Sequence, residues 1–294
     1  MMNTSQPIAT FSIVAYDPGR VEWGVAVQSK FLAVGAVVPW ARAGAGVVAT
    51  QSYANLAYGP DGLDLMAQGM SAAETLATLT AADPGRAQRQ AGLVDRAGRA
   101  AAFTGDECHF WAGHHVGDGY ACQGNILVPG TVEAMAAAFE DARRGPGELA
   151  DWLVTALAAG QAAGGDSRGR QAAAVTVVRA GGGYGGNNDR YLDLRVDDDP
   201  TPIARLQQLV AMHHLYFGAV DPANVVPLAA IAAELQAMLR ATGDYTGPQH
   251  GEFDAATRTA LRALVGRENL EERWDGTADA IDGLALDYLR RRFG

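Results

Sequence analysis

The sequence predicts an α+β domain followed by a small helical domain. Short apolar strands alternate with pairs of helical patterns, which favours a mainly antiparallel sheet covered by helices over a parallel βαβ arrangement. The 294 residues leave room for one large and one small domain, and a hydrophobic content of 48% suits a buried core. The pattern changes near Gly218, so we expect domains at 10–218 and 219–294.

Local patterns predict the elements of both domains. A capping box at Ser71 and Glu74 begins a helix that ends before Pro84. A helix at 201–218 joins the domains, and apolar stripes predict two helices after it, around 228–239 and 253–264. In the large domain we expect a hairpin at 9–30, two strands within 33–51, helices within 59–83, a strand pair at 91–105, helices at 131–144 and 147–163, and strands at 172–180 and 190–200.

Composition excludes several classes of protein. A net charge of −10 without a basic tract argues against a nucleic-acid partner. Two cysteines, Cys108 and Cys122, do not make a disulfide framework, and no apolar run reaches the ~18–20 residues of a membrane span. Residues 1–9 lack the basic start and apolar core of a secretory signal. We therefore expect a cytoplasmic protein without a membrane partner.

Thr10 opens the first predicted strand and is a candidate nucleophile. If the leader at 1–9 is removed, the α-amine of Thr10, with an ordinary pKa near 8, becomes the base that activates its hydroxyl. The hairpin returns Lys30 to the start of the strand, where its charge favours a neutral amine and stabilises developing negative charge. The alternative is an ordinary strand threonine and a lysine that points to water.

Several stretches together resemble the DUF1028 family, which is assigned to the N-terminal-nucleophile (Ntn) hydrolase superfamily. The similarity spans roughly residues 10–217, and many members begin Met-Thr-Phe-Ser, whereas this chain carries the additional leader. The stretches are TFSIVAYDPGRVEWGVAVQSKFLAVGAVVPWARAGAGVVATQ, YGPDGLDLMAQGMSAAETL, AADPGRAQRQ, AAFTGDECHFWAG, CQGNILV, GQAAGGDSRGRQAAA and YGGNNDRYLDLRVDD.

The resemblance implies a four-layer αββα sandwich that hydrolyses an amide-type bond through a Thr10 acyl ester, with Ser12 as the fallback hydroxyl. We also expect a small amide substrate, no cofactor and a homodimer. In that mechanism Gln123, Gly124 and Asn125 are the expected source of donors to the tetrahedral intermediate. A glycine turn before Ile126 explains the same residues without a function.

Charged and aromatic loops supply further candidates. Asp166 and Arg168 follow a double glycine and are expected to bind a charged group of the substrate, although a loop that ends a helix also accounts for the glycines. His109 is expected to line a pocket, with a packed aromatic loop as the alternative. For Asp83, Arg86, Arg89 and Gln90 a solvated helix end is the preferred interpretation.

Other motifs are better explained by structure. The histidines and cysteine of CHFWAGHH lack a standard zinc spacing, so we expect no metal. Thiol catalysis at Cys122 lacks a partner set but stays open. The glycine-rich 181–186 lacks a phosphate-loop pattern and indicates a hairpin loop. Asp193 and Arg195 are expected to pair with each other.

The carboxyl-terminal stretch LQAMLRATGDYTGPQHGEFDAATRTALRALVG resembles a small three-helix peptidoglycan-binding-like domain. Because the chain shows no export signal, we favour dimerisation or covering of a pocket over glycan binding. We therefore expect the protein to be an Ntn amidohydrolase that acts on a small amino-acid-like or peptide-like substrate. The alternatives are a non-catalytic scaffold of the same fold and a cell-wall glycan-binding protein.

Overall fold

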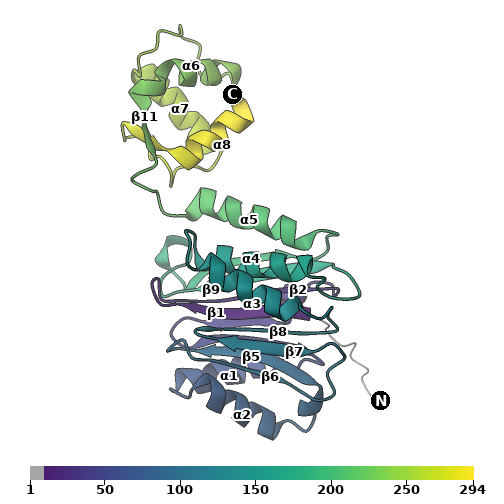
Figure 1. Cartoon of the computed structure of the whole chain (residues 1–294). Helices are drawn as coiled ribbons and strands as arrows, with labels where there is room; N and C mark the ends of the chain where they lie inside the picture. The colour runs from purple at the N-terminus through teal and green to yellow at the C-terminus, as the bar shows by residue number, and fades with distance from the viewer. Residues whose placement is uncertain (1–9) are drawn as a thin grey trace. The chain divides into compact units, whose positions relative to one another are not determined.

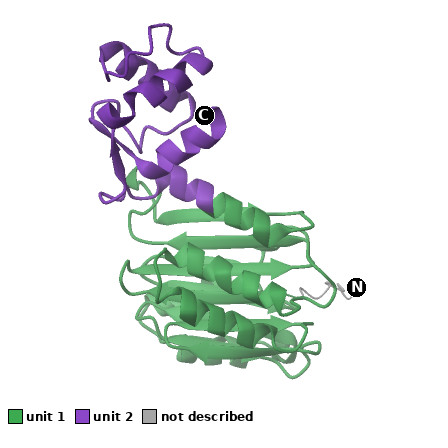
Figure 2. Cartoon of the chain, turned by 45° about the horizontal axis from the view of Figure 1, so that its top comes forward, with its two compact units in different colours: residues 1–210 green, residues 211–294 purple. Residues whose placement is uncertain are grey.

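A computed structural model gives the fold of the chain and describes residues 10–294 (Figure 1). The predicted leader at 1–9 lies outside the described residues. The chain divides into two compact units between Val210 and Ala211 (Figure 2). This division falls inside helix α5 (Pro202–Phe217), upstream of the boundary expected at Gly218.

The first unit contains a six-stranded sheet in which neighbouring strands are antiparallel. The hairpin of β1 and β2 lies at its centre, and Gly19 N donates to Asp17 Oδ1 over 2.8 Å in the connecting turn. The glycine-rich stretch 181–186 connects β9 to β10, as expected of a hairpin loop. Across the sheet the order is β10 (Arg190–Val196), β9 (Ala172–Val178), β2 (Glu22–Ser29), β1 (Thr10–Asp17), β8 (Tyr120–Asn125) and β7 (Gly113–Gly117).

A four-stranded antiparallel sheet packs against the first through alternate side chains. Because successive residues of a strand point to opposite faces, Val14 and Val27 meet Val47 and Val94 between the sheets. All four valines are fully buried. The strands of this second sheet follow the order β3 (Pro39–Arg42), β4 (Gly46–Ser52), β5 (Arg89–Asp95) and β6 (Ala100–Thr104).

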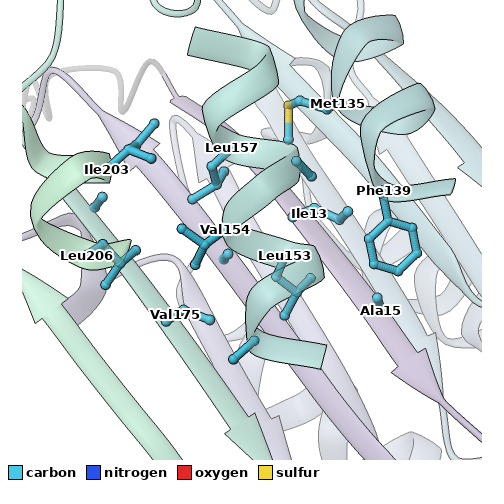
Figure 3. Close-up of a cluster of buried hydrophobic side chains, with 14 of the residues drawn as sticks. Ile13, Ala15, Met135, Phe139, Leu153, Val154, Leu157, Val175, Ile203 and Leu206 are labelled. Atoms are coloured by element: carbon cyan, nitrogen blue, oxygen red, sulfur yellow. The ribbon is translucent and has the colours of Figure 1, made fainter. Parts of the chain in front are cut away.

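Helices cover the outer face of each sheet. Apolar residues of α3 (Thr131–Ala142), α4 (Leu149–Ala162) and the first part of α5 pack on Ile13 and Val175 of the six-stranded sheet (Figure 3). Helices α1 (Tyr58–Ala67) and α2 (Ala72–Ala82) pack on the four-stranded sheet. The capping box predicted at the start of α2 is present. The order of layers is therefore helices, sheet, sheet, helices (Figure 1).

The second unit has a hydrophobic core of its own, formed by residues such as Leu235, Leu261 and Leu286. Its ion pair Arg273–Asp282, at 2.8 Å, is buried. The mixed fold with a helical carboxyl-terminal region is thus confirmed. The elements of this unit are β11 (Val225–Pro227), α6 (Ala232–Ala241), α7 (Ala255–Arg267), β12 (Ala280–Asp282) and α8 (Gly283–Phe293).

Short 3₁₀ turns complete the secondary structure, at Val34–Ala36, Arg86–Gln88, Tyr184–Gly186 and Leu228–Ile231. Within residues 10–294, no helix has both the length and the apolar character needed to cross a membrane. The expected pair Asp193–Arg195 forms at 2.9 Å on the edge strand β10.

Candidate functional site

Thr10 is the first residue of the central strand β1, at the edge of the six-stranded sheet where strand ends meet, between two polar neighbours. It is opposite Ser29 of β2 on one side and Asn125 of β8 on the other, so the three side chains share the face that meets the second sheet. Thr10 is fully buried, and its Oγ1 forms no hydrogen bond with any residue in the described range. A buried hydroxyl without a partner costs free energy, a condition that Thr10 shares with the buried hydroxyl of Thr75.

Ser12, the fallback nucleophile, is engaged in hydrogen bonds. Its Oγ donates to Gln51 Oε1 over 2.6 Å and accepts from Gln123 Nε2 over 2.6 Å. Gln123 has space for this bond because Gly92 of β5 lacks a side chain. A Cβ at position 92 would lie 2.1 Å from Gln123 Oε1. Ser12 and Gln123 therefore form part of a buried link between the sheets.

The hydrogen bonds that join the two sheets continue from Ser12 to the edge where Thr10 lies. Gln51 Nε2 donates to Gln90 Oε1 at 2.8 Å and lies 3.3 Å from the carbonyl oxygen of Thr10. Asn125 Nδ2 also donates to Gln90 Oε1, at 3.0 Å. The glutamine and asparagine side chains involved are all fully buried. At Gly124 a Cβ would stand 2.3 Å from Leu127 Cδ1 and 3.0 Å from the carbonyl oxygen of Thr10, so there is no room for a side chain at this position.

Lys30, Asp166 and Arg168 meet at the same edge. Lys30 follows the residue opposite Thr10, and its backbone N–H donates to Asp166 Oδ2 over 3.0 Å. Asp166 is buried and pairs with Arg168, whose Nη2 lies 2.9 Å from Oδ2. The Lys30 side chain is exposed and runs past the loop, with its Cδ 4.0 Å from where a Cβ of Gly169 would lie. The two charged loop residues thus bind each other and hold the end of β2.

His109 belongs to a loop that is tied to the end of β8. Its carbonyl oxygen accepts from Ile126 N over 3.1 Å, and its exposed ring lies 3.5 Å from the hydroxyl of Tyr53. Ile126 and Ser52 both have left-handed backbone conformations, with φ of 55° and 65°. Such conformations are strained for residues other than glycine and cluster at functional sites. Ile126 directly follows β8, which pairs with β1 beside Thr10, and Ser52 ends β4 of the other sheet.

In the stretch expected to be a solvated helix end, Asp83 and Gln90 are buried, which corrects that prediction for these two residues, whereas Arg89 is half-buried and Arg86 is exposed. The Asp83 carboxylate accepts from Asn55 Nδ2 at 3.1 Å and from Arg89 Nε at 2.9 Å. Burial alone would raise the pKa of Asp83, but hydrogen bonds from Arg89, Asn55, the Gly85 backbone and Tyr58 outweigh it and hold the pKa well below its usual range. Asp83 therefore joins the loop after β4 to the start of β5.

The cysteines are poorly suited to nucleophilic chemistry. Cys122 is fully buried among the apolar residues under the helices, and this burial strongly raises the pKa of its thiol. Burial also raises the pKa of the Cys108 thiol. Within residues 10–294 no three histidine, cysteine, aspartate or glutamate side chains are grouped to hold a metal ion.

The structure thus gathers Thr10, Lys30, Gly124, Asn125 and the pair Asp166–Arg168 at one edge. Ser29 and Gln51 were not predicted from the sequence, and Gln90 was predicted to have a different role. Each of the three lies at the end of an apolar strand, in VAVQS, VVATQS and RQAGLV, and this recurrence is the signal that could have identified them.

Comparison with known proteins places the chain in a family. A family model described as "Family of unknown function (DUF1028)" matches residues 10–206, and one described as "Putative peptidoglycan binding domain" matches residues 217–289. The crystal structure of protein SPO2555 from Silicibacter pomeroyi, a DUF1028 protein, is similar with a TM-score of 0.62 and 29% identity, covering 70% of this chain and 89% of that chain. No curated protein matches the chain. The chain therefore belongs to the DUF1028 family and carries a peptidoglycan-binding-like domain after it.

Proposed function

We propose that the DUF1028 part of the chain is an Ntn amidohydrolase with Thr10 as its nucleophile, built on the four-layer αββα sandwich of that superfamily. The observation that carries the proposal is the Thr10 hydroxyl. It is fully buried at the start of a central strand, it has no hydrogen-bond partner within residues 10–294, and it lies between Ser29 and Asn125. The strained backbone at Ser52 and Ile126 supports a functional role for this edge.

In the proposed reaction, removal of the leader frees the α-amine of Thr10. The Thr10 Oγ attacks the carbonyl carbon of the amide, and the amine takes the hydroxyl proton through a water. The tetrahedral intermediate collapses to an acyl ester as the amine of the substrate leaves with a proton. Water then hydrolyses the ester. Asn125 Nδ2 and the backbone beside Gly124 are the proposed donors to the oxyanion.

Lys30 and the loop that contains Asp166 complete the proposed site. The ammonium group of Lys30 would lower the proton affinity of the Thr10 amine by like-charge repulsion, which keeps the amine neutral and basic. Asp166 fixes the backbone of Lys30 through the 3.0 Å hydrogen bond. We assign Arg168, whose side chain is one-third exposed, to recognition of a carboxylate of an amino-acid-like or peptide-like substrate. His109, exposed beside Tyr53, is assigned to the rim of the same site.

Intact-mass measurement on purified protein, combined with a screen of amides, tests the proposal. The screen covers acyl-amino acids, ureido compounds and cyclic amides. We expect hydrolysis of at least one class by a chain whose first residue is Thr10. Hydrolysis by a preparation in which every chain still begins at Met1 would contradict the proposal, because the Thr10 nitrogen would then be an amide without basicity.

The carboxyl-terminal unit supports a second candidate function, glycan binding. The match at 217–289 is to a peptidoglycan-binding description, and a cavity of about 680 Å³ lies in this unit, lined by residues that include Tyr245, His250, Asp254 and Thr259. We expect the full chain to co-sediment with insoluble peptidoglycan. Thr259→Arg, which places a long charged side chain in the cavity, should reduce this co-sedimentation. If Thr259→Arg and the exposed control Arg291→Ala co-sedimented equally, the cavity would be excluded as the glycan-binding site.

A further inference from the structure

Gln90 lies in the four-stranded sheet, yet it contacts Asn125, the proposed oxyanion donor, and Gln51, whose amide lies beside Thr10. Its Oε1 accepts from Asn125 Nδ2 at 3.0 Å and from Gln51 Nε2 at 2.8 Å. Gln51 Nε2 in turn lies 3.3 Å from the carbonyl oxygen of Thr10. One side-chain oxygen therefore receives hydrogen bonds from the proposed oxyanion donor and from the amide that touches the nucleophilic residue.

The nitrogen end of the same amide fixes its orientation. Gln90 Nε2 donates to the carbonyl oxygen of Gly124 over 2.8 Å and to Thr104 Oγ1 over 2.9 Å. If the amide were flipped, its NH₂ group would face the NH₂ groups of Gln51 and Asn125, and its oxygen would face the Gly124 carbonyl. Since a fully buried amide cannot exchange these contacts with water, one orientation is strongly favoured.

This geometry determines where the hydrogens of Asn125 point. An amide nitrogen is planar, so the hydrogen bond to Gln90 sets the directions of both N–H groups of Asn125. A donor to an oxyanion is effective only when it is aimed in advance at the place where the charge develops. Gln90 also holds the strand carbonyl next to Asn125 through its bond to Gly124.

We propose that Gln90 is a positioning residue, which aims the Asn125 amide at the oxyanion and so sets the rate of acylation of Thr10. The inference rests on the proposed function, because it concerns the same nucleophile. Gln90 acts through Asn125 and Gln51 rather than on the substrate.

Gln123 provides a matched control. It is an equally buried glutamine of the same interface, and its side-chain amide donates to Ser12 rather than to Asn125 or Thr10. Gln90→Leu and Gln123→Leu each remove one buried amide and insert an apolar side chain. Only Gln90→Leu removes the acceptor of Asn125, so the pair separates positioning from loss of packing.

The test is the rate at which a β-lactone probe acylates Thr10, followed by intact mass and peptide mapping. The Thr10 oxygen attacks the lactone carbonyl, the ring C–O bond breaks, and the ring oxygen takes the proton, so the protein gains the whole mass of the probe. We expect Gln90→Leu to react at least ~10-fold more slowly than Gln123→Leu, since loss of an oxyanion donor costs ~10²–10³-fold. Equal rates in the two variants, with wild-type protein labelled at Thr10, would overturn the assignment of Gln90. Absence of labelling at Thr10 in wild-type protein would instead refute the proposed function and the inference with it.

Gln90→Glu keeps the proposal testable if Gln90→Leu does not fold. When protonated, the introduced carboxyl group accepts from Asn125 through its carbonyl oxygen and donates its O–H to the Gly124 carbonyl, as the glutamine does. When ionised, it faces that carbonyl with negative charge. We expect the labelling rate relative to wild type to be highest at acid pH and to fall ~10-fold as the carboxyl ionises. A ratio that does not change with pH would contradict a positioning role.

Discussion

Thr10→Ala is expected to reduce hydrolysis of a responsive amide by about 10⁴- to 10⁶-fold, the range seen when the nucleophile of a hydrolase is removed. The reason is that only Thr10 would carry the freed α-amine beside its hydroxyl, whereas Ser12 already donates to Gln51 and Ser29 lies within the chain on β2. The initial rate of amine release, measured on the best substrate of the screen, gives the result.

Thr10→Ser is the control for this prediction. It retains the hydroxyl and the α-amine, so we expect it to keep measurable turnover. The thermal midpoint of Thr10→Ala should stay close to that of wild type, because the lost oxygen makes no hydrogen bond within the described chain. Undiminished turnover in a folded Thr10→Ala protein would move the chemistry to another residue.

Asp83→Ala is expected to lower the free energy of unfolding by about 3–5 kcal/mol, the cost of removing one partner of a buried ion pair. The side chain is 7% exposed and Arg89 only 21%, so the substitution leaves a half-buried guanidinium without its carboxylate. Asn55 and the Tyr58 hydroxyl, which both lie 3.1 Å from Asp83 Oδ2, would lose their acceptor as well. Urea denaturation at neutral pH measures the loss.

The contribution of Asp83 should depend on pH in a defined direction. Its pKa is lower in the folded chain than in the unfolded chain, where it is near 3.9. The stabilisation is therefore fully present above that value and is lost as the pH falls towards the folded pKa. The difference in stability between wild type and Asp83→Asn should shrink as the pH is lowered from about 5 to 2.

Asp64→Ala supplies a comparison, because Asp64 pairs with Arg42 at 2.7 Å on the surface, with both side chains about half exposed. We expect this variant to lose less than ~1 kcal/mol. Equal losses for Asp83→Ala and Asp64→Ala would show that the buried carboxylate does not hold the loop after β4.

Local sequence patterns predicted most of the helices and strands, because turns and helix caps are determined by residues that are close in the sequence. The turn DPGR closes the β1–β2 hairpin, and the capping box at Ser71 starts α2. Strands β7 and β8 were not predicted between residues 105 and 131. The β7 segment GHHVG has no apolar alternation, and it pairs only along one side, with β8. Helix α8 (Gly283–Phe293) was likewise not predicted, although its Leu286 and Leu289 are buried.

The candidate site was predictable only where neighbours in sequence become neighbours in space. The hairpin alone places Lys30 next to the residue opposite Thr10. The contact between Thr10 and Asn125 comes from pairing of β1 with β8, two strands far apart in the sequence, and no local pattern encodes it. Gln51 and Gln90 come from the other sheet, so their role depends on how the two sheets pack.

The absent side chain at Gly92 also limits how the two sheets can shift along each other and which residues can occupy positions 92 and 123. A translation of one layer along the other would move the Gln123 amide away from the space that Gly92 leaves for it, so this contact favours one alignment of the layers. A larger residue at 92 requires a shorter one at 123. In related chains we expect these two positions to change as a pair.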